Sequence, residues 1–275
     1  IGLLHWYTLD QEMNDPYYLQ IRSGIESYLS SGGVEIVRIF KNDTNRSTLL
    51  DGLDGLICLG KFSPNEMRQL TSSCLHVIFL DMQTPLIEFN TIVLDLENAM
   101  KEVVGYLAAC GFERVGFLGG HEILEDGSVY PDARVEGFLK EAKARSLEYD
   151  PFFLIDAYTK ESGYRMMRQL LEQPAQPQAV VCCSDPIAIG AMRAIREKGL
   201  HVPEDISIIG FDDIEDARYC DPPLTTVHAP ANELGRYGAM LLLDLMEKRI
   251  DLPFQMKLPC HLALRKSVRM TPDKN

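Results

Sequence analysis

Several features common in enzymes and membrane proteins are absent from this chain of 275 residues. No apolar run approaches the roughly 20 residues that a membrane-spanning helix requires, and no signal-peptide pattern opens the chain. The sequence holds no GxGxxG, CxxC or GxSxG motif, so the signatures of a dinucleotide site, a zinc ribbon and a hydrolase nucleophile are missing. We therefore expect no membrane partner, no metal, no cofactor and no catalytic machinery.

Two segments approach a catalytic motif and fail at a decisive position. Residues 55–62 nearly spell a phosphate-binding loop, but Phe62 stands where a Ser or Thr must hold magnesium. Residues 121–125 begin like the HExxH zinc site of a protease, yet Glu125 replaces the second histidine. We read both as chance matches, which favours a protein that is not an enzyme.

Basic residues are scarce: Lys and Arg number 27 against 40 Asp and Glu, a formal net charge of −13. Such a surface repels a phosphate backbone, so this chain alone is not expected to bind nucleic acid. The seven cysteines are odd in number and mostly lie in apolar runs. This usage predicts buried free thiols in a reducing compartment, and thus a cytoplasmic protein.

Short apolar runs that suit buried strands alternate with amphipathic helical patterns along the chain. The expected strands cover residues 1–6, 34–40, 55–60, 76–80, 91–94, 115–119, 179–183 and 206–211. Between them apolar residues repeat at helical spacing, as in Val103, Val104 and Leu107. This alternation predicts an α/β fold with parallel sheets covered on both faces, and the length favours two lobes.

Four of the apolar runs end in an aspartate: residues 77–81, 91–95, 180–185 and 208–212. In open parallel sheets ligands bind outside the carboxyl ends of the strands. Each Asp alone could instead cap the following helix, but the four together predict a polar ligand site. Such carboxylates suit sugar capture, and they also suit a glycosidase, which needs two of them. The residues alone leave both readings open.

The segment from Ala179 to Val227 reads AVVCCSDPIAIGAMRAIREKGLHVPEDISIIGFDDIEDARYCDPPLTTV. It resembles the LacI/GalR family of bacterial repressors, in which a strand ending in Asp, an AIGAMRAI helix, DISIIGFDD and PPLTTV follow in that order. Further matches are DPYYLQIRSGIE, LAACGFERVGFLGG and LALRKS. The resemblance therefore spans nearly the whole chain.

The resemblance implies a periplasmic-binding-protein-like fold of type I, with two lobes, each a parallel sheet covered by helices, and three crossovers. By this analogy the first lobe comprises residues 1–94 and 231–255, and the second residues 95–230 and 256–275. It also implies a homodimer and a small sugar effector between the lobes. Operator DNA would be bound only through a helix-turn-helix that would precede Ile1.

Carried over by position, the resemblance implies ligand contacts at Trp6, Asp15, Tyr17, Tyr18, Asp81, Tyr130, Arg134, Tyr158, Ser184, Asp185 and Asp212. Asp185 either contacts ligand or caps its helix, and both roles stay open. Ala229 departs from many sugar-binding members, which carry a polar residue there. Because Arg134 and Asp212 would line an open cleft, their removal is expected to weaken sugar binding and to spare the fold.

The resemblance predicts the sugar-sensing, effector-binding part of a transcriptional repressor. Galactose or a galactoside is the first expected effector, because the DPYY segment and Trp6 resemble regulators of galactoside use. The alternative is a periplasmic sugar-binding protein of a transporter, which shares the fold class. Seven cysteines disfavour that alternative.

Overall fold

The computed structural model describes residues 1–269, and in it the chain forms two compact units. The first unit comprises Ile1–Leu94, Ile123–Ser128 and Pro230–Leu258, and the second contains Asp95–Glu122, Val129–Ala229 and the described residues from Pro259 onward. Relative to the lobes expected from the sequence, Ile123–Ser128 joins the first unit and the last crossing follows Leu258. Residues 270–275 of the expected second lobe lie outside the described part.

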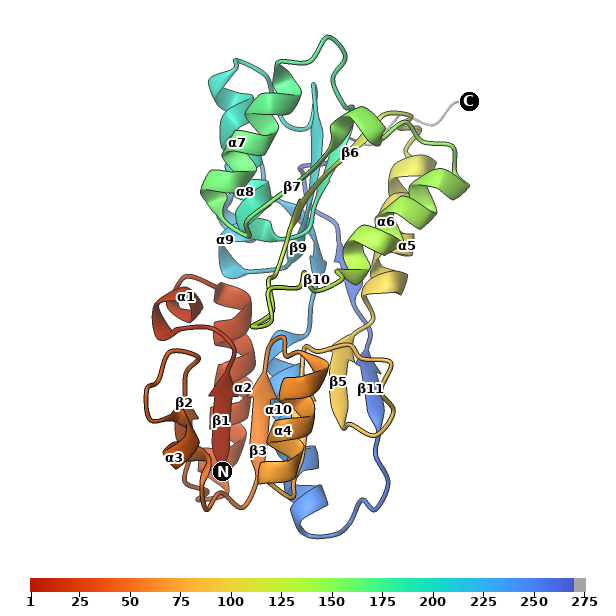
Figure 1. Cartoon of the computed structure of the whole chain (residues 1–275). Coiled ribbons are helices and arrows are strands. Elements are labelled where there is room, and N and C mark those ends of the chain that lie inside the picture. The colour runs from red at the N-terminus through yellow and green to blue at the C-terminus, as the bar shows by residue number, and fades with distance from the viewer. Residues whose placement is uncertain (270–275) are drawn as a thin grey trace. The chain divides into compact units, whose positions relative to one another are not determined.

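The first unit is built on a six-stranded sheet in the order β11-β5-β4-β3-β1-β2, in which all paired strands are parallel (Figure 1). Its strands are β1 (Gly2–His5), β2 (Val37–Ile39), β3 (Leu56–Leu59), β4 (Val77–Leu80), β5 (Thr91–Leu94) and β11 (Gln255–Leu258). Its helices are α1 (Leu9–Met13), α2 (Pro16–Ser31), α3 (Arg46–Leu50), α4 (Pro64–Ser73) and α10 (Ala231–Met246). Helices α2 and α10 pack together on one face and α4 covers the other.

The second unit repeats this plan with the order β12-β10-β9-β8-β6-β7, in which only β12 runs antiparallel to its neighbour. Its strands are β6 (Val115–Gly120), β7 (Phe153–Asp156), β8 (Ala179–Cys182), β9 (Ser207–Asp212), β10 (Thr225–His228) and β12 (His261–Ala263). Its helices are α5 (Leu96–Ala109), α6 (Ala133–Ala144), the 3₁₀ turn η1 (Asp150–Phe152), α7 (Lys160–Leu171), α8 (Asp185–Glu197) and α9 (Glu215–Tyr219). Helices α5 and α6 cover one face, and α7 and α8 the other (Figure 1).

The structure confirms the α/β class and has a strand at each of the eight expected apolar runs, with β6 and β9 each ending one residue later than expected. Strand β2 is the shortest of these, spanning Val37–Ile39 where residues 34–40 were expected. The sequence analysis missed β7, β10, β11 and β12. Three of them lie at sheet edges and are partly exposed, so they lack the continuous apolar run that marks a central strand. Strand β10 is buried but reads TTVH, with polar residues where an apolar run was sought.

Candidate functional site

Asp81 is the centre of a polar cluster in the first unit, directly after β4. Its carboxylate accepts hydrogen bonds from the hydroxyls of Tyr17, at 3.0 Å, and Tyr18, at 2.8 Å. Lys61, which follows β3, forms an ion pair with the same carboxylate and also donates to the Asp81 carbonyl. Asp81 is therefore held by three donors and presents a preorganised group at the carboxyl end of the sheet.

The two tyrosines reach Asp81 because Asp15 fixes the start of α2. The Asp15 carboxylate accepts from the backbone N–H groups of Tyr17, at 3.1 Å, and Tyr18, at 3.3 Å, and Pro16 occupies the first helical position. This is the helix start that an Asp-Pro pair predicts. The structure thus gives Asp15 a capping role, and a ligand contact by Asp15 remains a prediction.

Trp6 follows β1 and packs tightly against the turn after β3. Its indole ring stacks on Tyr7, with ring centroids 4.6 Å apart, and the Lys41 ammonium lies 5.5 Å from its centroid. A Cβ added at Gly60, whose φ is +113°, would lie 1.7 Å from Trp6 Cδ1. Only glycine therefore permits this placement of the indole, whose buried Nε1 has no hydrogen-bond partner within the described residues.

Arg134 is the centre of a second cluster, in the second unit. Its Nη1 donates to the carbonyl of Cys183 at 2.7 Å, and its Nε donates to Asp132 at 3.0 and 3.1 Å. Its Nη2 donates to the Tyr158 hydroxyl at 2.8 Å, and that hydroxyl donates to Asp132 at 2.6 Å. The guanidinium carbon lies 5.2 Å from the ring centroid of Tyr158 and 5.4 Å from that of Phe211. The cluster joins residues that follow β6, β7 and β8 with an aromatic residue of β9.

Charge and burial compete in this cluster. Burial alone would raise the pKa of Asp132, but the charge of Arg134 and hydrogen bonds from Arg134 and Tyr158 outweigh it and hold this pKa below its usual value. Burial opposes the charge on Arg134, yet Asp132 raises the Arg134 pKa well above its ordinary range. Burial also raises the pKa of the Tyr158 hydroxyl. Arg134 is therefore a permanent cation, Asp132 an anion and Tyr158 a neutral donor.

Ser184 and Asp185 open α8 at the carboxyl end of β8. The Ser184 hydroxyl caps the helix by accepting from the Ile187 N–H at 3.4 Å. Asp185 is fully buried and accepts from the Ile214 N–H at 2.9 Å and from the Thr226 hydroxyl at 2.6 Å. Asp185 thus links the start of α8 to Ile214, after β9, and to Thr226 in β10. This structural role is a third one, beside the ligand contact and the helix cap that the sequence left open.

Asp212 ends β9 with a φ of +106°, in a backbone region that side chains rarely adopt. Its neighbour Asp213 also has positive φ, but its carboxylate is held by an ion pair with Arg265 and by His228 at 3.0 Å. Ala229 donates its N–H to the Asp212 carbonyl at 3.4 Å. Strained backbone at the end of a central strand is a feature of ligand sites, and the ligand contact expected of Asp212 remains a prediction.

Five of the expected ligand-binding residues lie in the two clusters. The structure brings Tyr17, Tyr18 and Asp81 into direct contact in the first unit, and Arg134 and Tyr158 in the second. Tyr130 lies in the loop before α6, where its N–H donates to the Glu122 carbonyl at 2.9 Å. A ligand contact by Tyr130 remains a prediction.

Lys61, Asp132 and Gly60 were missed by the sequence analysis. Asp132 precedes Arg134 by two residues and caps α6, so the Asp-Ala-Arg spacing was an available capping signal. Lys61 lay in the rejected phosphate-loop segment and had no signal of its own. Its role depends on the pairing of β3 with β4, which sequence spacing does not show.

Within residues 1–269, no group of three or more His, Cys, Asp and Glu side chains has a geometry that could hold a metal ion. In the same range no helix combines the length and apolar character needed to cross a membrane. Four of the cysteines, Cys58, Cys74, Cys182 and Cys183, are buried.

Comparison with known proteins identifies the family. A model described as "Periplasmic binding protein-like domain" matches residues 104–268. The chain is 33% identical over 278 residues to the HTH-type transcriptional repressor MelR of Bacillus subtilis, covering 98% of this chain and 79% of that protein. It is 32% identical over 271 residues to the repressor CytR of Escherichia coli, covering 94% of this chain and 77% of that protein.

A solved structure shares the fold: a lac repressor dimer bound to operator and to the anti-inducer ONPF, with 25% identity and a TM-score of 0.84. The match covers 97% of this chain and 93% of that one. These relatives are regulators of transcription, which agrees with the resemblance carried by the Ala179–Val227 segment. The two sheets with their helices form the type I periplasmic-binding-protein-like fold, and the chain belongs to the LacI/GalR family of transcriptional regulators.

Proposed function

We propose that this chain senses a small sugar, and that sugar binding alters the affinity of a repressor for its operator. The Arg134 cluster is the observation that carries the proposal. A fixed cation, a fixed anion and two aromatic rings lie at the carboxyl ends of adjacent strands, where α/β sheets bind ligands. Guanidinium groups donate to sugar oxygens and aromatic faces cover apolar C–H surfaces, so this chemistry suits a sugar.

The ligand contacts that the resemblance implies are proposed for each unit by itself. From the second unit, Arg134 would donate to a hydroxyl oxygen, Asp212 would accept from one or two hydroxyls, and Tyr158 would pack against the ring. From the first unit, the Asp81 cluster and Trp6 would supply hydroxyl groups, a cation and a flat apolar face. Tyr130 and Ser184 would lie at the margin of the site, and Asp15 and Asp185 would act by holding α2 and α8 in place.

The proposed partners follow from the family. The chain would act as a homodimer in the cytoplasm and would reach operator DNA only through a helix-turn-helix outside these residues. Seven cysteines, four of them buried, fit a reducing compartment. The chain would respond to a sugar without chemically changing it, because the proposed contacts serve binding alone.

A thermal-shift screen over common mono- and disaccharides tests the proposal, with galactose and galactosides as the first candidates. A sugar present at about 100 times its Kd should stabilise the folded chain by about 2.7 kcal/mol. Asp212→Asn should weaken the identified sugar at least tenfold, because it replaces a charged acceptor of hydroxyl hydrogen bonds. Asparagine tolerates positive φ well, so the melting temperature without sugar should change little.

Asp150→Asn is the matched control, since it makes the same charge change at an exposed residue of η1. Its sugar affinity should equal that of the parent. A chain that no sugar stabilises would refute the effector class. An Asp212→Asn variant with parental affinity would leave the class intact and remove Asp212 from the site. Hydrolysis of chromogenic glycosides by the parent would instead favour a glycosidase.

A further inference from the structure

Helix α1 buries a charged side chain and exposes its apolar ones. Glu12 is its buried residue, with only 1% of its surface exposed, whereas Leu9 is 48% and Met13 64% exposed. The hydrophobic effect alone would favour the opposite orientation of this helix, with Leu9 and Met13 turned inward. The orientation of α1 is therefore set by the groups that Glu12 contacts.

Glu12 links α1 to two other segments of the first unit. Arg22 in α2 donates from Nη1 to Glu12 Oε2 at 2.7 Å. The Nδ1 of His5, the last residue of β1, lies 2.8 Å from Glu12 Oε1. The His5 ring also stacks on Phe40, with ring centroids 4.5 Å apart, and its Nε2 has no hydrogen-bond partner within residues 1–269. Glu12 therefore supplies the polar contact that orients the His5 imidazole.

Stability alone does not explain a charge buried at this place. The Glu12 side chain is 1% exposed and that of Arg22 is 22% exposed, so both lose much of their hydration. Replacing a buried ion pair with apolar side chains of similar volume is often neutral or even stabilising. Hydrogen bonds to a carboxylate have a defined length and direction, whereas apolar contacts are not directional. The contacts of Glu12 thus select one arrangement of β1, α1 and α2.

The segments that Glu12 joins carry two aromatic residues of the proposed sugar site. Trp6 directly follows His5 in the chain. Tyr18 lies four residues before Arg22, on the same side of α2. A displacement of Glu12 would therefore reach both aromatic side chains through short stretches of backbone.

We propose that Glu12 is a positioning residue of the sugar site, which holds the end of β1 and the start of α2 so that Trp6 and Tyr18 present a fixed aromatic surface. Glu12 itself would not touch the sugar. This inference rests on the proposed function, because it takes Trp6 and Tyr18 as sugar contacts. Its claim about the placement of Trp6 can be tested without any sugar.

Fluorescence tests the proposal, because Trp6 is the single tryptophan of the chain and is buried. Glu12→Gln removes the charge at nearly constant volume, so α1 should lose the contacts that oppose burial of Leu9 and Met13. In the native protein without sugar, the acrylamide quenching constant of Trp6 should rise at least twofold, and its emission maximum should shift to the red. Arg22→Gln should cause the same change. The double variant should change no more than either single variant, because all three lose the same contact.

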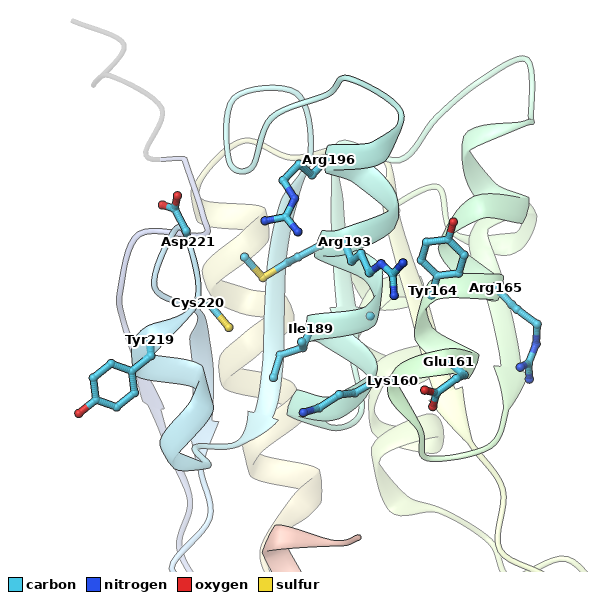
Figure 2. Close-up of a pocket in the computed structure, with 12 residues that line it drawn as sticks. Lys160, Glu161, Tyr164, Arg165, Ile189, Arg193, Arg196, Tyr219, Cys220 and Asp221 are labelled. Carbon is cyan, nitrogen blue, oxygen red and sulfur yellow. The ribbon is translucent and has the colours of Figure 1, made fainter.

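Two glutamates of the second unit provide matched controls. Glu161→Gln makes the same change of charge at an exposed residue of α7, which lines a pocket of about 690 Å³ that contains none of the proposed sugar contacts (Figure 2). Glu141→Gln breaks a partly buried ion pair with Arg145, and so controls for a general loss of stability. Both variants should keep the parental fluorescence of Trp6.

The possible failures are distinguishable. Parental quenching and emission in folded Glu12→Gln would overturn the proposal, whatever the melting temperature, because Glu12 would then be a purely structural residue. If Glu12→Gln did not fold, Arg22→Gln would decide by the same measurement, since its side chain is partly exposed. Neither result would affect the sugar screen. A changed Trp6 signal in a chain that no sugar stabilises would support the positioning of Trp6 and refute the sugar effector.

Discussion

The guanidinium of Arg134 holds together three segments of the second unit through Asp132, Tyr158 and the carbonyl of Cys183. Its side chain is only 14% exposed and that of Asp132 only 9%. These contacts contradict the expectation that removing Arg134 would spare the fold, since Asp132 would be left as an unpaired buried anion. The expectation assumed an open cleft and could not include Asp132, which no motif identified.

Arg134→Ala should therefore destabilise the chain as well as weaken sugar binding. Removing one partner of a buried ion pair costs about 3–5 kcal/mol. Urea denaturation should show the loss in the absence of any sugar. Arg165→Ala is the control, because its pair with Asp156 is largely exposed and should contribute at most about 1 kcal/mol. Equal urea midpoints for Arg134→Ala and the parent would show that the cluster is solvated rather than structural.

Asp185 gives the second unit a pH dependence of a defined sign. Burial raises its pKa to about 7, although hydrogen bonds from Thr226 and from the Ile214 N–H oppose the shift. An unfolded Asp has a pKa of about 4, so between these values the folded chain keeps a proton that the unfolded chain has released. The stability linked to this proton is fully present below about pH 4 and is lost as the pH rises through about 7.

Asp185→Asn removes this titration. As the pH rises from about 4 to about 8, the unfolding free energy of the parent should fall relative to the variant by up to roughly 4 kcal/mol. Chemical denaturation at several pH values measures the difference directly. Asparagine does not titrate, so residue 185 of the variant contributes nothing to stability that varies with pH. A difference that stays constant across this range would show that Asp185 is ionised throughout.

At the scale of elements, α7 and α8 meet so closely that their backbones touch. A Cβ at Gly190 would lie 1.9 Å from the Lys160 carbonyl oxygen, and one at Gly163 would lie 2.1 Å from that of Ile187. Backbone atoms cannot yield as a side-chain end can, so two glycines fix the distance between these helices. The same pair of helices positions Tyr158, just before α7, and Ser184, at the start of α8.

Gly190→Ala should destabilise the second unit, although alanine is the better helix former. Overpacking a well-packed contact costs about 1–3 kcal/mol, which exceeds the gain in helix propensity. Gly105→Ala in α5 is the matched control, because its nearest neighbour is the end of the Arg145 side chain at 3.4 Å. That variant should be stabilised by about 0.4–1 kcal/mol. Melting temperatures that shift in the same direction for both variants, relative to the parent, would contradict the backbone contact between α7 and α8.

The elements that the sequence predicted and those it missed differ in one physical respect. Central strands such as β3 and β4 are buried on both faces and read as apolar runs, which makes them visible. Edge strands such as β7 and β11 owe their conformation to pairing with a neighbour distant in sequence. The same limit applies to the candidate site: Asp81 was visible at the end of an apolar run, whereas Lys61 acts through a contact with Asp81 that forms only in the fold.

At the scale of the whole molecule, the charge distribution should keep these residues away from DNA. The net charge is −13, and cations such as Lys160, Arg165 and Arg193 form ion pairs with carboxylates of the same unit. Non-specific DNA binding is driven by the release of counterions from phosphates that protein cations neutralise. A chain with this excess of negative charge opposes that term, so we expect these residues to contribute little to DNA binding.

Fluorescence anisotropy with a labelled DNA duplex should therefore show no binding by the 275-residue chain at low salt, up to about 10 µM protein. Basic proteins that bind DNA without sequence preference, with a Kd of about 10⁻⁶ M, are bound at that concentration. A lysine-rich peptide serves as the positive control for the assay. If the chain did bind, the salt dependence would identify the source, because log K falls by about 0.9 for each phosphate contact per tenfold rise in salt. A steep slope that Arg196→Glu reduces would locate the contact on α8 and would contradict the expectation that this chain alone does not bind DNA.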